Sequence, residues 1–276
     1  MTKPILLADR GVVEVAGPDA AKFLHGLVTN DVQRLAPGEA RFCALLAPQG
    51  KILFDFFVFA IGEGESRRYL LDCPKALEAD LLKRLNMYRL RSAVTVASLS
   101  DSLAVFALNE VARAGDAALA VAPDPRAETL GFRAIAPRAA LQAGAERADY
   151  DARRVAAGVP EGGVDFSYGE TFPHEANMDL LAGVDFKKGC FVGQEVVART
   201  QHRGLARRRI TRYRAEGGAP QPGTPVKAGE IDLGVTGSSQ GDLGLAMIRV
   251  DRLEDALGAG VTPQAGGARL EFQKGG

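Results

Sequence analysis

Two apolar runs joined by a tight turn restrict this chain to a fold with a buried β-hairpin. The runs "ARFCALLAP" at residues 40–48 and "KILFDFFVFAIG" at residues 51–62 are rich in aromatic and branched side chains, and a "PQG" turn lies between them. Such runs, broken by Pro and Gly, are typical of paired strands. The second run is about half as long as a membrane-spanning helix and contains Asp55. It therefore predicts a strand in a globular core rather than a membrane span.

The rest of the chain indicates two or three packed subdomains. Helical patterns cover residues 18–28, 74–90, 148–160 and 194–204, and strand patterns cover residues 11–15, 67–74, 93–99, 102–109, 118–123 and 131–137. From residue 207 the pattern changes to short strands separated by glycine turns, which predicts a small β-barrel. With 276 residues, 46% of them hydrophobic, the chain is long enough to build a substantial core.

Charge and cysteine content give the expected compartment. Lys plus Arg and Asp plus Glu are both 34, so the net charge favours neither nucleic acid nor a membrane surface as a partner. The three cysteines, Cys43, Cys73 and Cys190, are widely spaced and form no CxxC pair, which argues against a disulfide framework or a zinc site. The first residues, "MTKPILLADRG", have too short an apolar run for a signal peptide. We therefore expect a cytoplasmic protein.

The segment "KKGCFVGQE" at residues 187–195 is the strongest candidate for chemistry. A helix that begins near Gly193 would place the Cys190 thiol just before its positive end, beside Lys187 and Lys188. Both influences favour a thiolate and so predict a lowered thiol pKa. The alternative is a small buried side chain at a helix start, since free cysteines are commonly just buried. The other two cysteines lie in apolar strand patterns, for which core packing is the better interpretation.

Asp55 is a lone carboxylate in an aromatic strand. Alternation places it on one face with Leu53, Phe57 and Phe59 and places Ile52 on the opposite face. A carboxylate among apolar groups must be hydrogen-bonded, either by the protein or by a ligand such as an aminopyrimidine edge, which offers two N–H donors. The alternative is that this face meets water at a sheet edge.

Two further polar segments have both a structural and a functional interpretation. "TND" at residues 29–31 is either a turn that ends a helix, which we favour, or a set of side chains directed into a cleft. Residues 199–214 hold seven arginines. They form a solvated face, an RNA contact or a site for an acidic ligand tail. Few aromatic side chains are interleaved with them, so we expect no direct nucleic-acid partner.

Several blocks in this order resemble one known family. "DFKKGCFVGQEVVART" resembles the K-G-C-[Tyr/Phe]-x-G-Q-E signature of the folate-binding YgfZ family of iron–sulfur cluster assembly and repair proteins, which includes mitochondrial relatives. "GPDAAKFLHGLVTNDV", "LLAPQGKILFDFFV", "RRVAAGVPEGG", "FPHEANMDLLAGVDF" and "LGVTGS" also resemble family blocks, whereas the Ala-rich middle does not. The family is similar in fold to the glycine cleavage T-protein, an aminomethyltransferase. This implies an α+β fold with three subdomains in a ring around tetrahydrofolate.

The resemblance also implies domain limits. It predicts a first α+β subdomain from residues 1–45 with 145–205, a second α+β subdomain from 46–144, and a C-terminal β-barrel from 206–276. The expected function is a tetrahydrofolate-binding (or other reduced-folate-binding) accessory protein for iron–sulfur client enzymes, with no membrane partner. The alternative is a folate-dependent aminomethyltransferase of the T-protein type. Phe54 replaces the first of two aspartates that are frequent in the T-protein pattern, which favours the accessory role.

The implied site residues fall into two groups, and no residue is implied as a metal ligand. Cys190 and Lys188 are expected to be catalytic. Glu161 and Asp165 are alternatives for an acidic pterin contact. The complete set of expected folate-binding residues is Asn30, Asp55, Glu161, Asp165, Gln194, Glu195 and Arg199.

Overall fold

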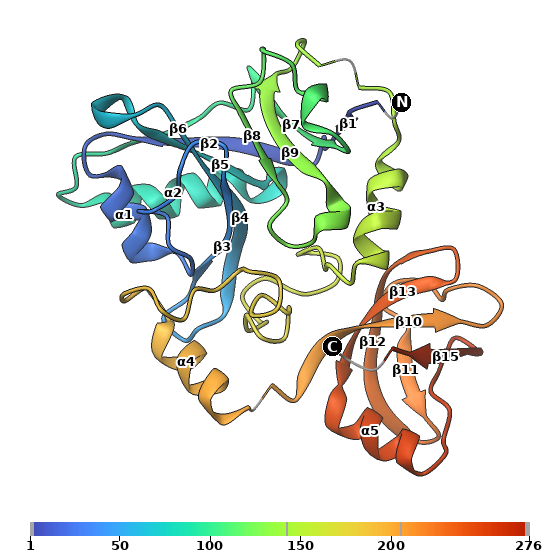
Figure 1. Ribbon diagram of the computed structural model, residues 1–276. Helices are drawn as coiled ribbons and strands as arrows, with labels where there is room; N and C mark the ends of the chain where they lie inside the picture. The colour runs from blue at the N-terminus through green and yellow to red at the C-terminus, as the bar shows by residue number, and fades with distance from the viewer. Residues whose placement is uncertain (1–2, 142, 205, 274–276) are drawn as a thin grey trace.

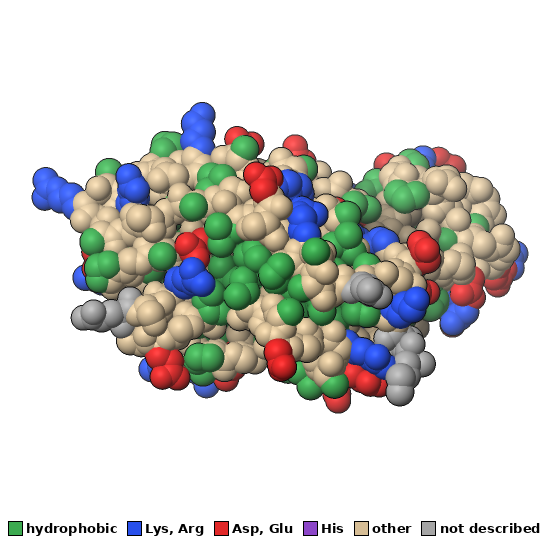
Figure 2. Space-filling model, turned by 90° about the horizontal axis from the view of Figure 1, so that it is seen from above, with side chains coloured by type: hydrophobic (Ala, Val, Ile, Leu, Met, Phe, Trp, Pro, Cys, Tyr) green, Lys and Arg blue, Asp and Glu red, His purple; other side chains and the backbone are tan. Residues whose placement is uncertain are grey.

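The computed structural model describes residues 3–141, 143–204 and 206–273. Three parts surround an irregular segment of about residues 157–193, which lies at the centre of Figure 1 in yellow. Two parts are layered α/β units, and the third is a barrel at the C-terminal end. Figure 2 shows the barrel as a lobe at one end of the molecule.

The first part is a five-stranded antiparallel sheet in the order β3-β4-β5-β2-β6. Its strands are β2 (Arg10–Ala16), β3 (Ala40–Leu46), β4 (Ile52–Ile61), β5 (Arg68–Pro74) and β6 (Thr95–Ser98). The helices α1 (Ala20–Leu27) and α2 (Glu78–Arg89) cover one face. Their buried side chains, such as Leu24 and Leu81, share a hydrophobic core with Phe54 and Phe56 of β4. The predicted hairpin of residues 40–62 is confirmed as β3 and β4.

The opposite face of this sheet packs against a second, four-stranded sheet. Its strands are β1 (Ile5–Leu6), β7 (Leu103–Leu108), β8 (Ala120–Pro123) and β9 (Phe132–Pro137), in the order β1-β7-β9-β8. Phe57 and Phe59 of β4 lie in one core with Val105 and Ile135 of this sheet. Short 3₁₀ turns complete the two layers at Gly64–Ser66, Lys75–Leu77, Val111–Arg113 and Glu128–Leu130.

Two helices border the central segment. α3 (Arg147–Ala156) begins the connection between the second sheet and the barrel, and it ends before Gly158, which has a φ of 73°. α4 (Gln194–Arg203) follows the "KKGCFVGQE" segment, between Gly193 and Gly204, both in the left-handed region. Glycine adopts this conformation without the steric cost that other residues meet. The predicted helix at 194–204 is therefore confirmed.

The C-terminal part is a closed six-stranded barrel in the order β10-β13-β12-β11-β14-β15. It consists of β10 (Arg208–Ala215), β11 (Pro225–Ala228), β12 (Ile231–Gln240), β13 (Leu243–Arg249), β14 (Gln264–Ala265) and β15 (Ala268–Phe272), with α5 (Val250–Gly258) between β13 and β14. Closure leaves no unpaired sheet edge. The barrel core is separate and contains Tyr213 and Leu233, both fully buried. The predicted α+β architecture with a C-terminal barrel is confirmed.

One detail differs from the predictions. A β-bulge in β4 makes Leu46 pair with Ile52 while Leu45 pairs with Phe54. The extra residue reverses the alternation, so Ile52 lies on the Phe57 side and Leu53 does not, and the predicted faces of these two residues were wrong. The predicted subdomain boundary at residues 45 and 46 falls at the end of β3, whose hairpin partner β4 belongs to the same sheet. The division into subdomains stays a prediction.

Candidate functional site

A small cavity lies where the two sheets, α3 and the central segment meet. Its volume is only about 20 Å³, close to the space that one water molecule occupies. Five arginines and three carboxylates contribute to its wall. The lining residues of this central cavity are Leu7, Asp9, Arg10, Asp55, Arg126, Arg133, Arg147, Tyr150, Arg154, Pro160, Glu161 and Gly162.

Asp55 points into this cavity from the inner face of β4. Its side chain is 6% exposed, and β4 is an interior strand, so the interpretation that Asp55 meets water at a sheet edge was wrong. The hydroxyl of Tyr168 donates a hydrogen bond to the Asp55 carboxylate. Burial, followed by the charge of Asp55, raises the pKa of Tyr168 well above its ordinary value, so this hydroxyl remains a donor. The protein itself therefore supplies one of the hydrogen bonds that the buried Asp55 carboxylate needs.

A buried ion network ties the two sheets together beside Asp55. Asp72 of β5 accepts hydrogen bonds from Arg10 Nε at 2.5 Å and from Arg133 Nε at 2.8 Å. Arg133 belongs to the second sheet, and its guanidinium lies 4.1 Å from the centre of the Phe57 ring. Burial alone would lower the pKa of Arg10, but the carboxylates of Asp72 and Asp55 outweigh it and hold that pKa above its ordinary value. Arg10 is thus fixed as a cation on the cavity wall.

α3 supplies a second set of cations to the same cavity. Arg147 donates to both oxygens of Glu161, at 2.7 and 2.9 Å. Arg154 donates to Asp165 at 2.9 Å and to Ser238 of the barrel at 2.9 Å. Asp165 also accepts from the backbone N–H groups of Glu161 and Ser238, so its bonding capacity is largely used. Of the two alternatives for the acidic pterin contact, Glu161 lines the cavity, whereas Asp165 joins the barrel to α3 through Ser238 and Arg154.

The polar groups of the central cavity suit a folate, but the space does not. A carboxylate such as Asp55 can accept two N–H bonds from an aminopyrimidine edge, and the arginines can pair with acidic groups. Pockets that bind small molecules or cofactors typically enclose about 300–1,000 Å³, whereas this cavity encloses about 20 Å³. The Tyr168 hydroxyl lies against Gly162, where an added Cβ would be 2.0 Å from its oxygen. A pterin ring could reach Asp55 only after Tyr168 leaves it.

The "TND" segment is hydrogen-bonded to β3 and to residues 182–183 of the central segment. The Thr29 hydroxyl donates to the Gly183 carbonyl at 2.6 Å, and Asn30 Nδ2 donates to the carbonyls of Phe42 and Ala182 at 3.0 and 2.7 Å. Asn30 is 8% exposed, and both donors of its amide are engaged by the backbone. This supports the structural interpretation of the segment. The expected folate contact of Asn30 stays a prediction.

Cys190 is exposed, four residues before α4 begins. Lys188, by contrast, is buried, and its ammonium donates to the carbonyls of His25 and Val28 at the end of α1, the first at 2.6 Å. Burial lowers the pKa of Lys188 to about 8, although the neighbouring acidic groups oppose it. Lys188 therefore anchors the motif to α1. Its catalytic role and that of Cys190 stay predictions.

The other two cysteines are core residues. Cys43 and Cys73 are at most 1% exposed, and burial raises the pKa of each thiol to about 12. Core packing, as predicted, describes both positions. Within residues 3–141, 143–204 and 206–273, no three His, Cys, Asp or Glu side chains form a group that could hold a metal ion. Across the same ranges, no helix is long and apolar enough to cross a membrane.

The expected folate contacts on α4 lie away from the central cavity. Gln194 is half-buried in the first turn, while Glu195 and Arg199 are exposed. Arg199 lines a different pocket, between α4 and the barrel, that shares no lining residue with the central cavity. The structure therefore does not bring the α4 residues together with Asp55. Their contact with a folate stays a prediction.

The arginine-rich segment is divided among several structural contacts. Arg209 pairs with Asp179 at 2.8 Å, Arg208 pairs with Glu175 at 2.7 Å, and Arg212 donates to the carbonyl of Ala156 at the end of α3. These contacts join β10 to the central segment and to α3. No arginine of this segment lines the central cavity, as far as the described residues go.

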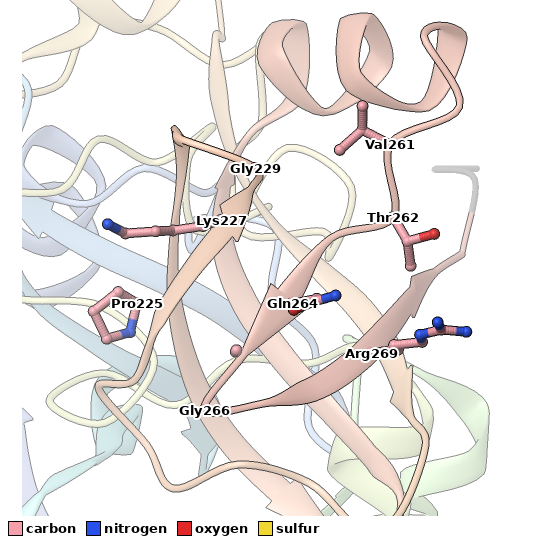
Figure 3. A pocket seen from close by; sticks show the side chains of 9 residues that line it. Pro225, Lys227, Gly229, Val261, Thr262, Gln264, Gly266 and Arg269 are labelled. Carbon is pink, nitrogen blue, oxygen red and sulfur yellow. The ribbon is translucent and has the colours of Figure 1, made fainter.

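A larger hollow, of about 560 Å³, lies on the outside of the barrel between β11, β14 and β15. Figure 3 shows its two cationic side chains, Lys227 and Arg269, pointing in opposite directions. They cannot converge on one ligand group. Neither a cysteine nor a carboxylate lines it. We therefore place the candidate site at the central cavity and the exposed Cys190 motif.

Sequence reasoning missed Tyr168 and the ion network of the cavity. Asp72 in "YLLDCP" and Arg133 in "GFRAIAP" are isolated charges within apolar strand patterns, the same signal that drew attention to Asp55. Their opposite signs could have indicated a buried pair. Tyr168 lies in an irregular segment with no periodicity, so no sequence pattern would have directed it toward Asp55.

Comparison with known proteins places the chain in a family. The family model described as GCVT N-terminal domain matches residues 8–115, and the one described as CAF17, C-terminal beta-barrel domain matches residues 207–274. The iron-sulfur cluster assembly factor IBA57 homolog of Mycosarcoma maydis is 35% identical over 286 residues, which cover 96% of this chain and 69% of that protein. The chain belongs to the IBA57 family of iron–sulfur cluster assembly factors.

Further comparisons support this membership and the fold. IBA57 of Homo sapiens is 33% identical over 91% of this chain and 78% of its own length, and both relatives are named as mitochondrial proteins. The crystal structure of the glycine cleavage aminomethyltransferase T of Bartonella henselae superposes with a TM-score of 0.75 at 17% identity, over 99% of this chain and 86% of that one. The predicted T-protein type of fold is confirmed. Assignment to the YgfZ branch itself stays a prediction.

Proposed function

We propose that this chain is an accessory protein for the assembly or repair of iron–sulfur clusters in client enzymes. The observation that carries the proposal is the contrast among its cysteines. Cys190 is exposed in the motif that the resemblance singles out, whereas Cys43 and Cys73 are buried with pKa values raised to about 12. Only Cys190 can meet a cluster or a client at the surface. Its relatives in the IBA57 family are named as cluster assembly factors.

Cys190 works with ligands from outside the chain in this proposal. A protein-bound cluster usually takes four protein ligands, and no metal-binding group of three was found among the residues that the structure describes. The remaining ligands therefore come from the client enzyme or from a small thiol. Lys188 contributes by holding the motif against α1 through the His25 and Val28 carbonyls. The sequence favours a cytoplasmic setting and the named relatives are mitochondrial; we propose only that the compartment is a reducing one.

The proposed small-molecule ligand is tetrahydrofolate or another reduced folate, bound at the central cavity. Asp55 would hold the aminopyrimidine edge, and the cations Arg147 and Arg154 lie close enough to contact acidic parts of the ligand. Binding requires Tyr168 to release Asp55, because its hydroxyl occupies that carboxylate, and it requires the cavity walls to move apart, because the cavity encloses only about 20 Å³. When bound, a reduced folate would supply a one-carbon carrier.

Two experiments test these parts separately. In a strain that lacks the gene, Cys190→Ala should fail to restore iron–sulfur enzyme activity, while the matched buried change Cys73→Ala restores it. Full rescue by Cys190→Ala would refute the role of the thiol and favour the aminomethyltransferase alternative, which needs none.

Anaerobic calorimetric titration of tetrahydrofolate should give binding to the wild type and to Cys190→Ala, and clearly weaker binding to Asp55→Asn. Absence of binding to all three would refute the folate part alone.

A further inference from the structure

A second pocket lies at the junction of α4, the central segment and the barrel. Its volume is about 410 Å³, within the range of small-molecule sites. Arginines reach it from several places: Arg199 from α4, Arg207 from just before β10, Arg208 from the start of β10, and Arg249 from the end of β13. We call this site the arginine pocket. It shares no lining residue with the central cavity, so a ligand in one site does not occupy the other.

The arginine pocket has more positive charge than its own carboxylates neutralise. Glu175 is engaged twice, because Oε1 accepts from Arg208 at 2.7 Å and Oε2 accepts from the Phe172 N–H at 2.9 Å. Arg249 pairs with Asp251 at 2.7 Å. Arg199 and Arg207 have no ion-pair partner within the described ranges, and both are exposed. Two guanidinium groups are therefore available to an anion.

His174 gives an independent sign of a ligand. It lines the pocket, and it is only 2% exposed. Its Nε2 contacts Gln201 Oε1 at 2.9 Å, whereas its buried Nδ1 has no hydrogen-bond partner. A buried polar atom without a partner costs about 1–3 kcal/mol. Because this atom is shielded from solvent, a ligand would satisfy it only by displacing the side chains that cover it.

We propose that the arginine pocket binds a small molecule that carries a phosphate group. Guanidinium groups form paired hydrogen bonds with phosphate oxygens, which suits Arg199 and Arg207. A phosphate that retains one hydroxyl can also donate to His174 Nδ1, which an ionised carboxylate cannot do. The apolar wall formed by Phe172 and Val196 accommodates the organic part of the ligand.

The test is a calorimetric titration of the full chain with inorganic pyrophosphate at constant ionic strength. The double variant Arg199→Gln with Arg207→Gln should bind at least ten-fold more weakly than the wild type. A matched control, Arg34→Gln with Arg91→Gln, removes the same charge from exposed positions that do not line the pocket and should bind within two-fold of the wild type. Because all four side chains are exposed, these variants are expected to fold, and circular dichroism checks this.

Three outcomes would overturn the proposal. They are absence of pyrophosphate binding, equal weakening in both double variants, and citrate binding as tight as pyrophosphate. The second outcome would reveal a general charge effect, and the third a site for polycarboxylates. Weak citrate binding combined with loss only in the Arg199 and Arg207 variant would support a phosphate site. Chemical shifts of backbone amides near His174 should move on addition of pyrophosphate.

Discussion

The ion network around Asp72 gives the sharpest test of how the two sheets are held together. Asp72 is fully buried and accepts from Arg10 at 2.5 Å and from Arg133 at 2.8 Å. Asp72→Asn keeps the shape of the side chain but removes its charge, and it turns an N–H₂ group toward one of the two arginines. The change leaves the two largely buried guanidinium groups of Arg10 and Arg133 with less negative charge beside them.

The expected cost follows from the geometry. Removing one partner of a buried ion pair typically costs about 3–5 kcal/mol. Here Arg133 keeps Asp124 at 3.5 Å and the Arg10 side chain is 11% exposed. The loss should therefore lie near the lower limit, about 3 kcal/mol. For a chain of this length each kcal/mol lowers the melting temperature by about 2–4 °C, which predicts a fall of about 6–12 °C.

Urea unfolding at pH 7, followed by circular dichroism, measures this cost. The control Asp232→Asn removes a carboxylate that is 72% exposed and 3.8 Å from Lys227. It should change the unfolding free energy by no more than about 0.5 kcal/mol. High salt should not reduce the unfolding free energy that Asp72→Asn loses, because buried ion pairs are weakly screened. The difference between this loss and that of Asp232→Asn should also remain. A cost for Asp72→Asn as small as that of the control would refute the view that this network joins the two sheets.

Three other predictions concern the candidate site. A thiol reagent should label one cysteine of the native protein quickly, and Cys190→Ala should abolish that label. All three thiols of the wild type should react after unfolding. Fast labelling of the native Cys190→Ala chain would contradict the buried state of the other two cysteines. Burial lowers the pKa of Lys188 from 10.5 to about 8, so between these pH values the unfolded chain binds more protons than the native one, and native stability gains as the pH rises. The unfolding free energy of the wild type minus that of Lys188→Met should accordingly increase from about pH 8 to 10.5, and a flat difference would show that the lysine is not desolvated. Tyr168→Phe removes the hydroxyl that occupies Asp55 and should strengthen tetrahydrofolate binding by about 0.5–1.5 kcal/mol, measured by anaerobic calorimetry; weaker binding would make the hydroxyl a ligand contact instead.

Local patterns predicted much of the secondary structure. The hairpin of residues 40–62, the helix at 194–204 and the C-terminal barrel are all present, because alternation, helix periodicity and glycine turns act over a few neighbouring residues. The bulge in β4 was not predictable in this way. It arises from pairing with β3 and exchanges the faces of Ile52 and Leu53.

Local sequence patterns also predicted only some of the residues of the candidate site. The exposed state of Cys190 agrees with a functional thiol, and Asp55 was recognised because one carboxylate interrupts an aromatic strand. Sequence spacing gave no means of seeing that Tyr168, 113 residues further along the chain, donates to that carboxylate. It also could not separate Arg199 from Asp55, which line different pockets.

The sequence by itself determined the elements, the cysteine motif and the family resemblance, since these depend on short stretches of residues in a fixed order. Only the tertiary structure decided which charges are paired, which cysteine meets solvent and how little space remains beside Asp55. Burial and ion pairing depend on groups brought together from distant parts of the chain, as Asp72 and Arg133 are. Their free energies arise from excluded water and short distances, which no single segment of the sequence contains.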